Sequence, residues 1–194
     1  MGLPPAKVLL IDLDPQGNCA TSFGIEKKRV KKTAYDLLTN DLGEELPLMD
    51  EYLIGPEDLT ASMRNAWMLR NEKGRPPATL TTENLWLLPS DIHLSGAEIE
   101  LSHKIGRETR LKEALAPIID KFDYIIIDTP PSLGLLSINA LSAANWVMVP
   151  VQAEYYSLEG FSMLMNSVKM IQRRINRNLK SFGVVMTTVD ARSK

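Results

Sequence analysis

The feature that most constrains the fold of this 194-residue chain is a hydrophobic run that ends in an acidic residue, within Phe122–Pro131. Residues Tyr124–Ile127 are apolar and rich in β-branched side chains, which is typical of a strand buried on both faces in a parallel sheet. Asp128 follows at the carboxyl end of the run, where open α/β sheets bind their ligands. Taken alone, this aspartate could instead start a turn or cap the next helix.

A second hydrophobic run, Lys7–Ile11, also ends in acidic residues and favours a shared site. Asp12 and Asp14 follow it, and the alternation of side chains along an extended chain places both on one side. Two parallel strands would then deliver three carboxylates to one edge of a sheet. Hard oxygen ligands suit Mg²⁺, which takes one or two carboxylates and keeps several waters. The two runs therefore predict a site for Mg²⁺ and phosphate built from Asp12, Asp14 and Asp128.

The rest of the chain alternates further strand patterns with helix patterns, which indicates an α/β fold with a doubly wound, mostly parallel sheet flanked by helices. No linker divides the chain, so we expect residues 1–194 to form a single domain. The expected strands are 84–88, 146–151 and 182–189, and the expected helices are 19–23, 34–39 with Thr33 as its N-cap, 108–122 kinked at Pro117, 132–144 and 157–178.

Composition limits the class of protein without deciding the function. The hydrophobic content of 44% is enough for a core, and the net charge of −2 gives no overall attraction to nucleic acid. Cys19 is the one cysteine, which fits a reducing cytosol. The segment from Thr129 to Ala153 carries no charged residue, yet polar residues and prolines divide it into a helix and a strand, so we expect no membrane span.

Four segments together resemble the ParA/Soj partition ATPases, which belong to the wider MinD-like group of P-loop NTPases with a deviant Walker A motif. The first two are the acid-ended runs, Val8–Asn18 and Phe122–Ser132. Leu88–Ser90 with Gly96–Leu101 is the third, and Val149–Gly160 is the fourth. The resemblance implies a P-loop NTPase-like sheet, although an incomplete one, with ATP or ADP and Mg²⁺ as cofactors.

The resemblance also implies roles for the three carboxylates. Asp128 would be the Walker B acid that holds Mg²⁺ mostly through water, and Asp12 would support the water shell of the metal. Asp14 would orient the attacking water. A carboxylate pair can also indicate a glycosidase, but these acids end buried strands without a recognisable substrate cleft. At the end of the last strand, the resemblance places three adenine-contacting residues: Thr187, Thr188 and Asp190.

The sequence departs from the family at its most diagnostic element. A P-loop reads G-x-x-x-x-G-K-[ST], and no Gly-Lys dipeptide occurs in residues 1–194. The chain therefore resembles a partition ATPase truncated at both ends, with an insertion near 61–80. We expect weak or absent ATP binding by this chain alone, and an unpaired strand edge with exposed apolar surface where a central strand is missing.

Three hypotheses follow for the function. The first is an ATPase of plasmid or chromosome partition, cytoplasmic and nucleoid-associated. Its implied partners are a ParB-like centromere-binding protein, non-specific DNA and a second copy in a homodimer. The second is a non-catalytic interaction protein that lacks the P-loop and pairs with an intact homologue. The third is a MinD-like division or polar-positioning ATPase.

Overall fold

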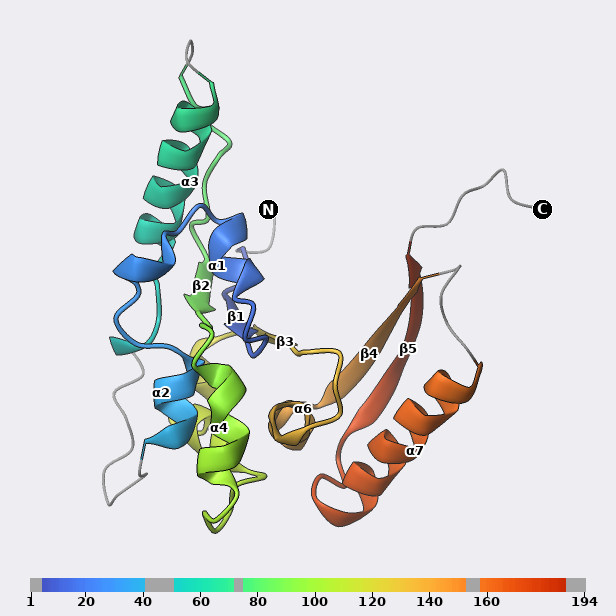
Figure 1. The fold of residues 1–194 in the computed structure, drawn as a ribbon. Coiled ribbons are helices and arrows are strands. Elements are labelled where there is room, and N and C mark those ends of the chain that lie inside the picture. Colours follow the sequence, from blue (N-terminus) through green and yellow to red (C-terminus); the bar gives the residue numbers. More distant parts are fainter. Residues whose placement is uncertain (1–4, 41–50, 72–74, 153–157, 188–194) are drawn as a thin grey trace, which may run out of the picture.

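The computed structural model describes residues 5–40, 51–71, 75–152 and 158–187 (Figure 1). Its elements, in chain order, are β1 (Val8–Asp12), α1 (Asn18–Ser22), η1 (Lys27–Arg29), α2 (Ala34–Thr39), α3 (Pro56–Arg70), β2 (Leu85–Leu88), α4 (Leu94–Leu101), α5 (Arg110–Leu115), η3 (Ile119–Lys121), β3 (Tyr124–Asp128), α6 (Leu135–Ala143), β4 (Trp146–Gln152), α7 (Leu158–Arg174) and β5 (Lys180–Thr187). The predicted alternation of strands and helices is confirmed.

The strands form two sheets, and every strand pair within them is parallel. The first sheet has the order β2-β1-β3, and the second pairs β4 with β5. Parallel neighbours require crossover connections, which the intervening helices supply. The α/β class with parallel strands and flanking helices is thus confirmed. Among the described residues β3 and β4 do not pair with each other, so the strands do not form one continuous sheet.

Helices cover both faces of the central strand β1, which is apolar on both sides. Leu9 and Ile11 are fully buried in the main core, with residues of α2, α4, α5 and α6. Leu10 points to the other face, where it packs in a smaller core with Leu59 of α3 and Ala20 of α1. This doubly wound arrangement leaves the carboxyl ends of β1 and β3 side by side at one edge.

The second sheet is covered on one face by α7. Val168 and Ile171 of that helix pack with Leu179 and with Leu141 of α6 in a separate core. Because α6 also places Leu136 and other residues in the main core, it joins the two sheets. Figure 1 shows β4 and β5 set apart from β1, β2 and β3, with α6 lying between them.

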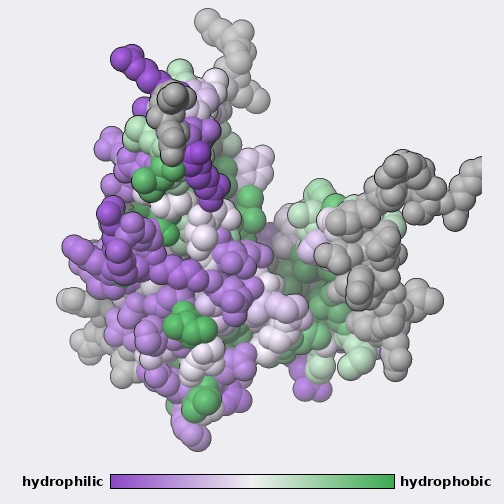
Figure 2. All heavy atoms as spheres, turned by 45° about the horizontal axis from the view of Figure 1, so that its top comes forward, coloured by the Kyte–Doolittle hydropathy of each residue, from purple (hydrophilic) through white to green (hydrophobic). Residues whose placement is uncertain are grey.

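Hydrophobic side chains are exposed where the two sheets face solvent. Tyr124 and Ile126 of β3 are 64% and 54% exposed, and Trp146 and Met148 of β4 are 55% and 56% exposed. In Figure 2 hydrophobic surface gathers on the part of the molecule that holds β4 and β5. Among the described residues, the outer edges of β3 and β4 have no strand partner. The expected unpaired edge and exposed apolar surface are therefore present.

Two local expectations are corrected. The run Tyr124–Ile127 was predicted to be buried on both faces, but its burial alternates because no described helix covers the face with Tyr124 and Ile126. The helix predicted over 108–122 is only α5, followed by the short turn η3. Pro117 accounts for this break, since proline has no backbone N–H to donate and disfavours helix before it.

The capping prediction for α2 is confirmed. The Thr33 side chain and that of Asp36 form a capping box, in which the backbone N–H of Thr33 donates to Asp36 Oδ2 at 2.8 Å. The region 61–80, predicted as an insertion, includes the later part of α3, which projects from the body (Figure 1); its residues 72–74 lie outside the described chain. The insertion itself stays a prediction. None of the described helices combines the length and the apolar character needed to cross a bilayer.

Gly24 allows the segment after α1 to close onto α3, and substituting it should destabilise the fold. Its φ is +73°, and a Cβ there would lie 2.5 Å from Ala66 Cβ and 3.0 Å from Ser62 O. We predict that Gly24→Ala lowers the free energy of unfolding by about 1–3 kcal/mol, measured by urea denaturation. The matched control Gly96→Ala lies within α4 with nothing inside 4 Å, so it should be neutral or stabilising. Equal effects of the two substitutions would contradict this packing.

Candidate functional site

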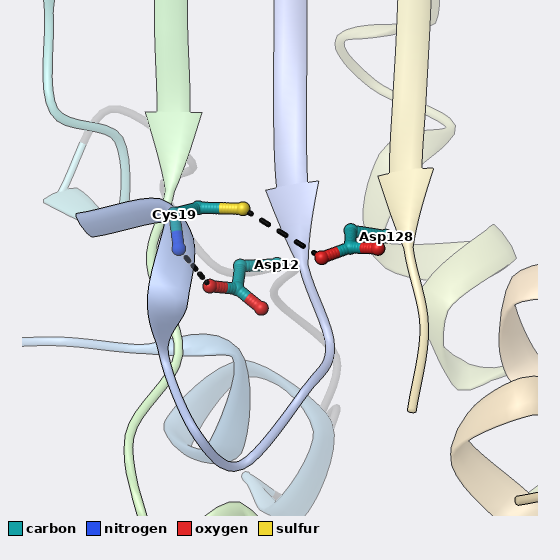
Figure 3. A group of neighbouring side chains, drawn as sticks. All are labelled: Asp12, Cys19 and Asp128. Atoms are coloured by element: carbon teal, nitrogen blue, oxygen red, sulfur yellow. Dashed lines mark hydrogen bonds between the residues drawn. The ribbon is translucent and has the colours of Figure 1, made fainter. Parts of the chain in front are cut away.

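The candidate site lies where β1 and β3 end together. The parallel register runs from Val8 opposite Tyr124 to Asp12 opposite Asp128, so the two carboxylates are direct cross-strand neighbours. Figure 3 shows both side chains at the carboxyl ends of their strands, on the side of the sheet where α1 begins. Asp12 is fully buried and Asp128 is exposed. The predicted meeting of these two acids is present in the structure.

The turn after β1 brings the start of α1 back over these carboxylates. The backbone N–H of Gly17 donates to Asp14 O at 2.9 Å, which closes the turn. Gly17 has a φ of +61°, and a Cβ on it would lie 2.8 Å from Ser90 O after β2. Glycine is therefore needed here both for the left-handed backbone and for the close approach to the neighbouring strand end. As a result, Cys19 in the first turn of α1 faces the two aspartates.

Backbone N–H groups hold the buried carboxylate of Asp12 in place. The N–H of Asp14 donates to Asp12 Oδ1 at 3.0 Å, and the N–H of Cys19 donates to Asp12 Oδ2 at 3.1 Å. Burial raises the pKa of Asp12, and these two hydrogen bonds oppose that shift. Asp12 is therefore fixed by the fold itself and does not need a salt bridge to define its position.

Cys19 completes a group of three side chains that the sequence analysis did not assemble. Its Sγ lies 3.8 Å from Asp128 Oδ2 (Figure 3), and one ligand atom from each of Asp12, Cys19 and Asp128 falls within 4.8 Å of the other two. From the sequence, Cys19 indicates a reducing compartment and begins a predicted helix, and neither observation places it at the site. Its position seven residues after Asp12, just past a tight turn, is the signal that could have placed it there.

The donor atoms of this group fit a divalent cation through the carboxylates rather than through sulfur. Burial, then the charge of Asp12, raises the pKa of the Cys19 thiol to about 12. The thiol is thus protonated at neutral pH, and a neutral thiol is a poor ligand for a hard ion. Oxygens of Asp12 and Asp128 are the atoms that suit Mg²⁺ here.

The third predicted carboxylate, Asp14, lies beside this group but not within it. Its Oδ1 accepts a hydrogen bond from the backbone N–H of Gln16 at 3.0 Å, so the side chain stabilises the turn after β1. Asp14 is half-buried and follows Asp12 by two residues, as the alternation required. The structure gives it a turn-capping contact, and its catalytic role stays a prediction.

The predicted adenine-contacting residues are only partly within the described chain. Thr187 ends β5, is exposed, and donates from its hydroxyl to Val151 O at 3.4 Å. Thr188 and Asp190 lie outside the described residues. Thr187 is therefore at the carboxyl end of a parallel strand, as predicted, but in the second sheet rather than beside Asp12 and Asp128.

Comparison with known proteins identifies the class to which this fold and site belong. The family model described as an AAA domain matches residues 4–181, so the chain belongs to that family. Within that family the chain is similar to proteins of the ParA/Soj type. It is 43% identical over 187 residues to the sporulation initiation inhibitor protein Soj of Bacillus subtilis, covering 96% of this chain and 62% of the relative. It is 37% identical to the chromosome partitioning protein ParA of Myxococcus xanthus, covering 96% and 56%.

Solved structures give the same fold. Cobyrinic acid a,c-diamide synthase from Mycobacterium smegmatis, with a bound ATP analog and magnesium, matches with a TM-score of 0.76 and 34% identity, covering 97% of this chain and 65% of that one. A Cyanothece McdA variant in complex with ATP matches with a TM-score of 0.70 and 25% identity, covering 93% and 58%. The chain thus spans less than two thirds of the length of these relatives and neighbours.

The position of Cys19 predicts an unreactive thiol. With a pKa of about 12, almost no thiolate is present near pH 8, and thiolate is the form that alkylating reagents attack. We predict that iodoacetamide labels Cys19 in the folded chain at least about 100-fold more slowly than in the urea-unfolded chain near pH 8, as measured by mass spectrometry. Asp128→Asn removes one neighbouring carboxylate and should speed the labelling. Equal rates in folded and unfolded protein would show that Cys19 does not face the carboxylates.

Proposed function

We propose that this chain is the carboxylate-bearing part of a ParA-type ATPase that segregates plasmid or chromosomal DNA in the cytoplasm, in association with the nucleoid. The observation that carries the proposal is the alignment of Asp12 with Asp128 at the carboxyl ends of two neighbouring parallel strands. In phosphoryl transfer the protein mainly positions the reactants and neutralises charge, which suits two carboxylates held at a sheet edge. The similarity to Soj and ParA supports partition as the process.

Each site residue has a proposed task in that reaction. Asp128, exposed beside the buried Asp12, would hold Mg²⁺ through water, and Asp12 would support the water shell of the metal from a position fixed by backbone N–H groups. Mg²⁺, when bound, neutralises charge on the phosphates. Asp14 orients the attacking water from the adjacent turn. Adenine is held at the end of β5, for which we retain the three predicted residues: Thr187, Thr188 and Asp190.

Residues 1–194 contain no G-x-x-x-x-G-K-[ST] segment, and this bears on activity. The backbone N–H groups of such a loop cradle the phosphates, and its lysine reaches the β- and γ-phosphates. We propose that these residues alone bind Mg-ATP weakly and do not hydrolyse it. With a phosphate-binding loop supplied, the active form is a homodimer that binds DNA non-specifically and responds to a ParB-like centromere-binding protein.

The second candidate function is a non-catalytic interaction protein. The observation that favours it is the exposed apolar surface on β3 and β4, including Ile126 and Met148, next to two strand edges that are unpaired among the described residues. Such edges pair readily with strands of other chains. A MinD-like positioning ATPase is a third candidate, which is supported only by the resemblance to the wider MinD-like group of P-loop NTPases.

A chimera separates the ATPase from the interaction protein. We predict that fusing a strand, a Gly-rich loop ending in Gly-Lys-Thr and a helix ahead of Lys7 gives a protein that binds Mg-ATP with a Kd of about micromolar order. Residues 1–194 alone should bind at least about 100-fold more weakly, because the phosphate cradle and its lysine are missing. Titration with a fluorescent ATP analogue measures both values.

Two variants of the chimera make the test specific. Replacing the loop lysine by alanine should abolish binding. Asp14→Asn keeps an oxygen for the Gln16 N–H, so it should preserve the fold and the binding while lowering hydrolysis by about 100-fold or more. A folded chimera without affinity for Mg-ATP would overturn the ATPase proposal in favour of the interaction protein. Micromolar binding by residues 1–194 alone would show that the loop is not needed.

A further inference from the structure

A groove lies between α3 and the segment that returns beside this helix to β2. Its volume is about 890 Å³, which is within the range of ligand-binding pockets in proteins. One wall consists of residues that recur at helical spacing along α3, from Asp58 to Met68. The other wall includes Pro76 and Glu83 of the returning segment. The groove shares no lining residue with the candidate nucleotide site.

Hydrogen bonds hold the two walls of the groove together. Thr82 Oγ1 donates to Pro56 O at 3.0 Å, and the backbone N–H of Thr82 donates to Thr60 Oγ1 at 3.0 Å. Farther along α3, Arg64 Nε donates to Leu80 O at 3.2 Å. The returning segment therefore runs antiparallel to α3 (Figure 1) and is fixed to it at two levels, so the groove is formed before any ligand binds.

Three exposed carboxylates gather at the end of the groove where α3 begins. Glu57 and Asp58 lie in the first turn of the helix, and Glu83 comes from the opposite wall. Among the described residues none of the three forms an ion pair, whereas Glu51 pairs with Lys32. The helix dipole accounts for acids at the start of α3, but not for Glu83. This end of the groove is therefore suited to an incoming cationic group.

The opposite end of the groove is apolar. Met68 is 47% exposed there, and the antiparallel path of the returning segment places Pro76 level with it. From Glu57 to Met68 the helix rises about 16 Å, which equals about five residues of an extended peptide. A groove of this length suits an extended chain better than a compact small molecule.

We propose that this α3 groove binds an extended segment of a partner protein, one that carries two basic residues and, about five residues away, an apolar side chain. Charge complementarity assigns the basic residues to Glu57, Asp58 and Glu83, and the apolar side chain then contacts Met68 and Pro76. Met68 and Pro76 fall within residues 61–80, the predicted insertion, which suggests a partner particular to this chain. The groove requires no nucleotide, and its role does not depend on the proposed partition function.

The test is fluorescence anisotropy with the full 194-residue chain and a labelled peptide of two arginines, a Gly/Ser spacer of about four residues and one leucine. The parent chain should bind it with a Kd of about 100 μM or tighter at about 100 mM salt. Glu57→Gln/Glu83→Gln removes two carboxylates from the groove and should weaken binding about fivefold or more. The matched control Glu98→Gln/Glu100→Gln removes the same charge from exposed residues of α4 and should change it less than about twofold.

A second series tests the apolar end of the groove. Met68→Ser, or a peptide with its leucine moved next to the arginines, should each weaken binding about threefold or more. The two changes together should weaken it little more than either alone, because both remove the same contact. The peptide change alters only the ligand, so its effect cannot come from misfolding of the chain.

Four outcomes would overturn the proposal. The parent chain could fail to bind the peptide, or both glutamine pairs could weaken binding equally, which would reduce it to overall charge. Affinity that is independent of Met68 and of the leucine position would remove the apolar contact. Displacement of the peptide by spermine at equal charge would assign the acidic end to a small polycation instead of a protein segment.

Discussion

The structure depends on the parallel register between β1 and β3. That register places Asp12 opposite Asp128, and it is fixed by the apolar residues before them, since a slip of one residue would turn Leu9 and Ile11 out of the core. Asp12 then becomes a buried carboxylate whose desolvation is offset by two backbone N–H donors. Those donors come from the turn that Gly17 makes possible. The geometry of the site therefore depends on both the packing of the core and the turn after β1.

The same arrangement explains why the site is open on one side. Asp12 and Asp128 share a face of the sheet with Ile126. On that face α1 packs with Leu10 of β1 and Leu87 of β2, and Cys19 at its start meets the carboxylates. Over β3 the face is exposed. An exposed apolar face on a strand is typical of a surface that another element covers. The exposed face of β3 is therefore a place where the proposed phosphate-binding segment could pack.

Much of the fold could be predicted from the sequence because its strands are strongly apolar and end in recognisable turns. The meeting of Asp12 and Asp128 followed from two acid-ended runs in a parallel sheet. The burial of β3 was predicted wrongly. An apolar run such as Tyr124–Ile127 shows that a strand is suited to burial on both faces, but it does not show that a helix covers each face. Helix length over 108–122 was overestimated because the apolar pattern continues past Pro117. Cys19 was missed because its proximity to Asp128 depends on how the turn closes, over 109 residues of separation.

The most direct test of the account is whether α1 and β3 bring their side chains together at the site. In an Asp128→Cys variant the new thiol would face Cys19, whose Sγ lies 3.8 Å from Asp128 Oδ2. Mild oxidation should therefore form a disulfide between positions 19 and 128 that mass spectrometry detects. An Asp123→Cys variant at the opposite end of β3 should form none. A thiol at position 128 that stays free under conditions that oxidise small dithiols would contradict the shared site of Asp12, Cys19 and Asp128.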